Sequence, residues 1–178
     1  MRTDGSPFGI AVADGFIAVQ ARDKVAIERA GRTVLTLSEA LGLRDRVLKH
    51  TQAILDASER SDWKSVRREL DRTQKTMRET MEQMRDGDLS NFVSIGGWIR
   101  GTEAMTSLIS TAYKADQAEL LNQPELAEHF SKLIGEMDKR VRGVAEVKAA
   151  DACLKELASL MGDGEGVIDL ESVTGLHA

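Results

Sequence analysis

Residues 91–105 read NFVSIGGWIRGTEAM, and this stretch decides how the rest of the chain is interpreted. It places Gly96, Gly97 and Gly101 in an apolar segment with helical spacing. Each glycine weakens a helix by about 1 kcal/mol relative to alanine, so close packing has to offset the loss. We therefore predict that this segment is the central helix of a bundle, with neighbouring helices around it.

Small residues within this segment share one side of the predicted helix. Ser94, Gly97 and Gly101 are three or four residues apart, so their side chains fall on the same face. Small side chains at this spacing let a second helix approach, and we expect the closest approach at Gly97 and Gly101. In a membrane the same pattern would indicate a dimerising span. Because Arg100 and Glu103 lie inside the segment, we predict that it does not span a membrane.

The rest of the chain also has helical periodicity. Two prolines and 4% aromatic residues leave little material for strands. We expect Asp23 to cap a helix and Pro124 to begin one, and we leave open whether the last helix breaks near Gly143. The predicted helices cover residues 8–21, 23–41, 44–60, 62–84, 89–121 and 124–161. The predicted fold is all-α, an antiparallel bundle of about five to seven helices around the glycine-containing helix. We expect one domain over residues 1–178, with 162–178 as a tail of loop and a short helical turn.

Composition limits the classes of function. A chain of 178 residues with 42% apolar and 30% charged residues is typical of a soluble globular protein. Its net charge of -5 argues against a nucleic-acid partner, which requires concentrated lysine and arginine. The single cysteine, Cys153, cannot form an internal disulfide. Cysteine content therefore does not indicate whether the protein is found in an oxidising or a reducing compartment. Phe8 to Val19 does not have the pattern of a signal peptide, because Asp14 interrupts it.

Three charged residues stand out because their surroundings are apolar. Arg100 and Glu103 are the only charges between Asn91 and Tyr113, and Asp14 is the only charge between Phe8 and Gln20. A charge in a buried helix needs a partner, so we expect Asp14 and Arg100 to meet.

Two interpretations of this contact remain open. One is a structural ion pair that fixes helix register. The other is a ligand-binding site formed by Asp14, Arg100, Glu103 and Trp98, in which the planar guanidinium binds an anionic group.

Metal and cofactor motifs are incomplete in this sequence. No paired Glu-x-x-His motif, zinc spacing or phosphate-binding glycine loop occurs. Residues 161–172 are similar to a calcium-binding EF-hand loop, but Met161 and Ser172 stand where an oxygen ligand and a bidentate glutamate belong. We predict no metal site, no cofactor and no catalytic residue.

The stretches VADGFIAVQARDK (residues 12–24) and VSIGGWIRGTE (residues 93–103) together resemble a family of uncharacterised bacterial all-helical proteins. The resemblance covers Gly9 to about Leu133. It implies export to the periplasm and no known activity; without it we would expect a cytoplasmic protein. It also implies that Asp14 and the region Gly97–Gly101 belong together.

Two hypotheses for function follow. The first is a non-enzymatic helical bundle that acts as a binding or interaction module for a protein or small-molecule partner. The second is a small-molecule pocket, with or without catalysis, centred on Asp14, Arg100 and Glu103. A solvent-reachable cavity beside Arg100 would favour the second, and a dry, fully paired cluster would favour the first.

Overall fold

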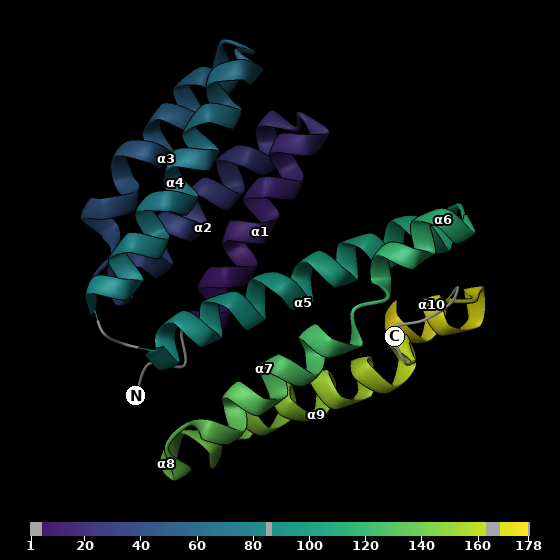
Figure 1. Ribbon diagram of the computed structural model, residues 1–178. Coiled ribbons are helices and arrows are strands. Elements are labelled where there is room, and N and C mark those ends of the chain that lie inside the picture. The colour runs from purple at the N-terminus through teal and green to yellow at the C-terminus, as the bar shows by residue number, and fades with distance from the viewer. Residues whose placement is uncertain (1–4, 85–86, 163–167, 178) are drawn as a thin grey trace. The chain divides into compact units, whose positions relative to one another are not determined.

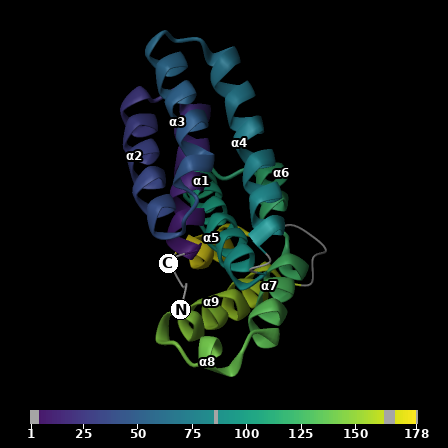
Figure 2. The ribbon, with the colours of Figure 1, turned by 90° about the vertical axis from the view of Figure 1, so that its left-hand side faces the viewer.

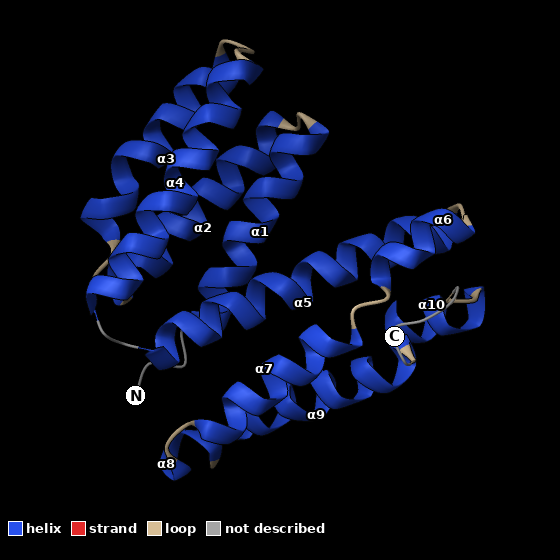
Figure 3. Cartoon of the chain, in the orientation of Figure 1, coloured by secondary structure: helices blue, strands red, loops and turns tan. Residues whose placement is uncertain are grey.

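The computed structural model describes residues 5–84, 87–162 and 168–177. All regular secondary structure in these ranges is helical, which confirms the all-α fold class (Figure 3). The chain divides into two compact units, Arg2–Arg100 and Gly101–Ala178, and helix α5 (Gly87–Thr111) contributes to both. The single domain with a C-terminal tail stays a prediction. No helix within the described ranges has the length and apolar character needed to cross a membrane.

The first unit contains four helices and the first part of α5. In chain order they are α1 (Gly5–Ala21), α2 (Lys24–Ala40), α3 (Arg44–Glu59) and α4 (Trp63–Met84). Helix α2 packs along α1 and α3, and α3 packs along α4, as the two views show (Figures 1 and 2). The expected cap is confirmed, because the Asp23 carboxylate accepts a hydrogen bond from the backbone N–H of Ala26 at 3.0 Å. The turn after α2 uses Gly42 at a φ of 70°, a conformation that suits glycine.

The core of this unit comes from the apolar stripes of its helices. One buried cluster joins α1, α3, α4 and α5 with the turn that follows α2: Phe8, Leu41, Leu43, Val47, Met77 and Leu89. A second buried cluster takes residues from each of the helices α1, α2, α3 and α4: Ala18, Val19, Ile27, Ala57 and Val66. On α4, Val66 and Met77 are therefore part of the surface that packs against the other helices.

The closest contact between α1 and α5 lies elsewhere on α5 than the sequence suggested. A Cβ built on Gly9 would lie 2.1 Å from the Val93 carbonyl oxygen, and one on Gly96 would lie 2.3 Å from the Ser6 carbonyl oxygen. A Cβ on Gly97 would meet the Gly9 carbonyl oxygen at an ordinary 3.6 Å. The tightest positions are therefore Gly9 and Gly96, where a side chain would collide with the backbone of the other helix.

The other two residues predicted for helix packing do not form this contact. No described atom within its own unit lies within 4 Å of a Cβ built on Gly101, apart from the nearby helix backbone. Ser94 is exposed, and its hydroxyl donates to the Ser90 carbonyl within α5. The face of α5 that meets α1 carries Leu89, Phe92, Val93 and Gly96. It is rotated by about one residue from the predicted face.

The second unit begins with the last part of α5. Helix α5 ends at Thr111 rather than near Leu121, and the hydroxyls of Ser110 and Thr111 both donate to the Ser107 carbonyl. Lys114 then takes an extended conformation and separates α5 from the next helix. The elements that follow are α6 (Ala115–Ala118), the 3₁₀ helix η1 (Glu119–Leu121), α7 (Pro124–Glu136), α8 (Lys139–Arg142), α9 (Ala145–Met161) and α10 (Leu170–His177).

The long C-terminal helix that the periodicity suggested is broken twice. Met137 is extended and Asp138 caps α8, and a second break at Gly143 separates α8 from α9. Helices α7 and α9 then lie side by side (Figures 1 and 2). The last helix, α10, extends the expected short turn to eight residues and buries Val173.

Candidate functional site: a cleft between α1 and α2

The structure brings Asp14 and Arg100 together, as the sequence predicted. The Nε–H of Arg100 donates to Oδ1 of Asp14, with the two atoms 2.6 Å apart. Helices α1 and α5 run in the same direction where they meet. The Asp14–Arg100 pair therefore lies further toward the C-terminus of both helices than the contact at Gly9 and Gly96. Its side chains are 43% exposed for Asp14 and 29% for Arg100. The pair is therefore only partly buried and lies at the surface of the unit.

Beside this pair lies a cleft of about 330 Å³ between α1 and α2. Five of its eleven lining residues are alanines, whose short side chains fill little of the space between the two helices. Asp23, Arg29 and Thr33 of α2 add polar groups. The complete lining is Ala11, Asp14, Ile17, Ala18, Ala21, Asp23, Ala26, Arg29, Ala30, Thr33 and Arg100.

The two acidic residues of the cleft already have hydrogen-bond donors. Asp14 accepts from Arg100, and Asp23 accepts from the backbone N–H of Ala26 at the start of α2. The Thr33 hydroxyl donates to the Arg29 carbonyl at 3.1 Å. The lining therefore contains two carboxylates and two guanidiniums, and both carboxylates are engaged.

Arg29 is the polar residue that the sequence did not single out. Its side chain is exposed and forms no hydrogen bond or ion pair with a described residue. In the sequence it resembles any charged residue on the outer face of α2. Only the packing of α2 against the alanines of α1 places it on the wall of a cleft.

The other two residues predicted for the site are Trp98 and Glu103. Trp98 is half-buried on α5 and does not line the cleft. Glu103 is exposed on the part of α5 that belongs to the second unit, and its backbone carbonyl accepts from the Thr106 hydroxyl at 2.8 Å. Within the first unit the cleft brings Asp14 and Arg100 together with Arg29, and a role for Trp98 and Glu103 stays a prediction.

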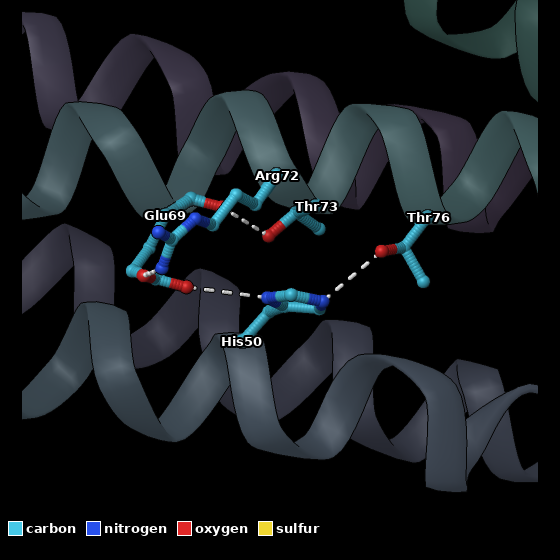
Figure 4. Close-up of polar contacts among 5 residues, drawn as sticks. All are labelled: His50, Glu69, Arg72, Thr73 and Thr76. Carbon is cyan, nitrogen blue, oxygen red and sulfur yellow. Dashed lines mark hydrogen bonds and ion pairs between the residues drawn. The ribbon is translucent and has the colours of Figure 1, made fainter.

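A second polar group, which the sequence analysis did not single out, joins α3 and α4 (Figure 4). Nδ1 of His50 lies 3.3 Å from Oε2 of Glu69, and Nε2 of His50 lies 3.1 Å from the Thr76 hydroxyl. Arg72 donates to the other carboxylate oxygen of Glu69 at 2.5 Å. The side chains of His50 and Glu69 are largely buried. Both ring nitrogens of His50 thus have partners on the neighbouring helix.

The environment of Glu69 lowers the pKa of its carboxyl group. Burial acts to raise this pKa, but the hydrogen bonds from His50 and Arg72 outweigh burial and stabilise the carboxylate. An acid, an imidazole and a hydroxyl in this order resemble a nucleophilic triad. Thr76, however, lies in the middle of α4, where the backbone N–H groups bond within the helix and cannot form an oxyanion hole. We interpret the group as a structural link between α3 and α4.

A small apolar cavity lies inside the first unit. Its volume is about 60 Å³, and it is lined by residues of α1, α2, α3 and α4 that include Gly15, Gly31 and Phe16. A space of this size can hold only a few atoms. A Cβ built on Gly15 would meet its nearest neighbour, the Cβ of Ala30, at 3.8 Å, so a methyl group fits there.

Among the described residues, no group of three or more metal-binding side chains occurs. The segment similar to a calcium loop includes residues 163–167, which lie outside the described ranges.

Comparison of this chain with protein-family models, with curated proteins and with solved structures gave no match.

Proposed function

We propose that the first unit is a non-enzymatic ligand-binding module, and that its site is the cleft between α1 and α2. One observation carries the proposal: Asp14 and Arg100, which come from two different apolar segments, meet at the wall of an open cleft. The contrasting arrangement, a dry and fully buried pair, would have favoured a purely structural role. A cavity of about 330 Å³ lies at the lower end of the range for small-molecule sites.

The geometry of the pair supports a binding role. A hydrogen bond from Nε at 2.6 Å fixes the direction of the Arg100 guanidinium before any ligand arrives. A group held in this way loses little conformational freedom on binding, and this preorganisation favours affinity. Most of the lining residues stand on helices rather than on loops, which favours a site of constant shape. The broader hypothesis of an interaction module with a protein partner stays a prediction.

The test is a ligand screen followed by nuclear magnetic resonance on the ¹⁵N-labelled protein. The screen uses neutral, anionic and cationic small molecules. We expect amide shifts to concentrate at Ala18, Ala26 and Ala30, because these residues line the cleft. Ala21→Leu should abolish the shifts, since Ala21 is an exposed lining residue and a larger side chain would fill the space.

Ala40→Leu is the matched control. Ala40 is exposed at the end of α2 and does not line the cleft, so this variant should bind like the parent. Shifts that concentrate elsewhere, or a cleft that binds nothing in the screen, would overturn the proposal. So would undiminished binding by Ala21→Leu.

A further inference from the structure

The charges of the cleft indicate the class of ligand. We infer that the cleft binds a small monocarboxylate with a short apolar body, and that Arg29 is the residue that recognises the carboxylate. This inference rests on the proposed function, since it names the ligand class of the same site.

Arg29 supplies the recognition because its hydrogen-bonding capacity is not engaged by the described residues. A guanidinium presents N–H donors in a planar fork and no acceptor, so its natural partner is an anion. A carboxylate matches the fork with two parallel hydrogen bonds. Asp14 and Asp23 cannot attract a further anion, and both already accept hydrogen bonds.

The charge balance of the lining favours a single negative charge on the ligand. Arg29 and Arg100 are offset by Asp14 and Asp23, so the lining has no net charge before binding. A dianion such as phosphate would meet repulsion from both carboxylates. A ligand with one negative charge has a single carboxylate, which pairs with Arg29. Asp14 meanwhile stays paired with Arg100 and holds its guanidinium in place.

The apolar part of the lining describes the body of the ligand. Alanines from both helices and Ile17 form the walls: Ala11, Ala18, Ala21, Ala26 and Ala30. These side chains offer methyl groups and no hydrogen-bonding atoms, so the part of the ligand beyond its carboxylate should be apolar. With about 330 Å³ available, a short branched chain fits better than a long acyl chain.

The experiment compares a carboxylic acid with its amide. The probes are 4-methylpentanoate, its neutral amide 4-methylpentanamide, and inorganic phosphate, titrated into the full chain and followed by amide shifts. We expect the acid to bind at the cleft at least about tenfold more tightly than the amide or phosphate, because hydrogen bonds to a charged group are the strong ones. Arg29→Gln should remove that preference. Arg32→Gln removes an exposed charge on the same helix outside the cleft, so it should not change binding.

The outcomes separate this inference from the proposed function. If the amide binds as tightly as the acid, or if Arg29→Gln leaves the preference intact, the ligand class is wrong. The binding module would survive that result as long as Ala21→Leu still abolishes binding. Tighter binding of phosphate than of the carboxylate would also overturn the inference. If neither the acid nor any molecule of the screen binds at the cleft, both proposals fail.

Discussion

Two glycines of the same helix should respond in opposite directions to the same substitution. At Gly9 an added methyl group would lie 2.1 Å from the Val93 carbonyl oxygen and 2.9 Å from the Gly97 nitrogen, both backbone atoms. At Gly15 it would lie 3.8 Å from its nearest neighbour, a methyl group. Both residues lie in α1, so an alanine at either position gains about the same helix propensity, roughly 1 kcal/mol.

The magnitude follows from the separation that the methyl group demands. A Cβ is essentially never found within 3.0 Å of such an atom, so Gly9→Ala must move α1 from α5 by at least about 0.9 Å, the difference between 3.0 and 2.1 Å. Overpacking of this kind costs about 1–3 kcal/mol, and rigid backbones on both sides place the cost at the upper end. After the gain in propensity, we expect Gly9→Ala to destabilise by about 1–2 kcal/mol and Gly15→Ala to stabilise by up to about 1 kcal/mol.

Urea unfolding followed by tryptophan fluorescence measures the difference. Trp63 and Trp98 are the only two tryptophans, and both belong to the first unit, so their signal reports on that unit. The free energies of unfolding of the two variants should differ by about 2–3 kcal/mol. If Gly9→Ala is as stable as Gly15→Ala, then α1 and α5 do not meet at Gly9, and the assignment of the α1–α5 contact is wrong.

Three further outcomes are expected. Because the Glu69 pKa is lowered in the folded state, its contribution to stability is complete above the unfolded pKa of about 4 and is lost as pH falls through the folded value. Urea unfolding from pH 7 to 3 should therefore show a shallower loss for Glu69→Gln than for the parent; equal slopes would contradict this. A double-mutant cycle of Asp14→Ala and Arg100→Met should give a coupling of about 1 kcal/mol or less, because the pair is partly exposed; about 3 kcal/mol would indicate a buried pair. Burial and Glu156 raise the pKa of the Cys153 thiol, so at neutral pH an aromatic disulfide reagent should react more slowly with the native protein than with the protein in urea, and equal rates would refute this.

The helices could largely be predicted from the sequence, because their signals are local. Asp23 caps α2 and Pro124 begins α7, and each depends on residues within one turn. The breaks at Thr111 and Met137 were missed for a physical reason. Apolar periodicity continues across both positions, and a single extended residue, Lys114 or Met137, does not alter that periodicity.

The face by which α5 meets α1 could not be predicted, because adjacent glycines point in different directions. Gly96 and Gly97 differ by about 100° around the helix, and each belongs to a stripe of small or apolar residues. Propensity and spacing are the same for both stripes. Only the partner helix distinguishes them, since Gly9 and Ser6 supply the surface that Gly96 fits.

The His50 group could have been found by counting from the turn between α3 and α4. An antiparallel helix pair places residues at similar distances on either side of its turn next to each other. His50 lies before the turn at Ser61 by 11 residues, and Glu69 and Thr76 follow it by 8 and 15 residues, one turn of helix on either side of the opposite position. The sequence thus contained the pairing, but a lone histidine in a polar stretch did not draw attention to it.

The cleft needed information that a single helix does not contain. Asp14 and Arg100 could be recognised because their neighbours are apolar. The same reasoning left open whether the pair is buried or lies beside a pocket, although an apolar neighbourhood usually means burial. The alanines on α1 and α2 decide whether the pair is buried. Short side chains on two adjacent helices leave space at the surface beside the pair, and the pair stays partly exposed. Arg29 illustrates the converse, because its own segment is ordinary and its significance arises only from the wall that it shares with Arg100. Asp14 and Arg100 locate the site because charges are unusual in their segments. Arg29, which we expect to determine the ligand specificity, lies in a segment where charged residues are common.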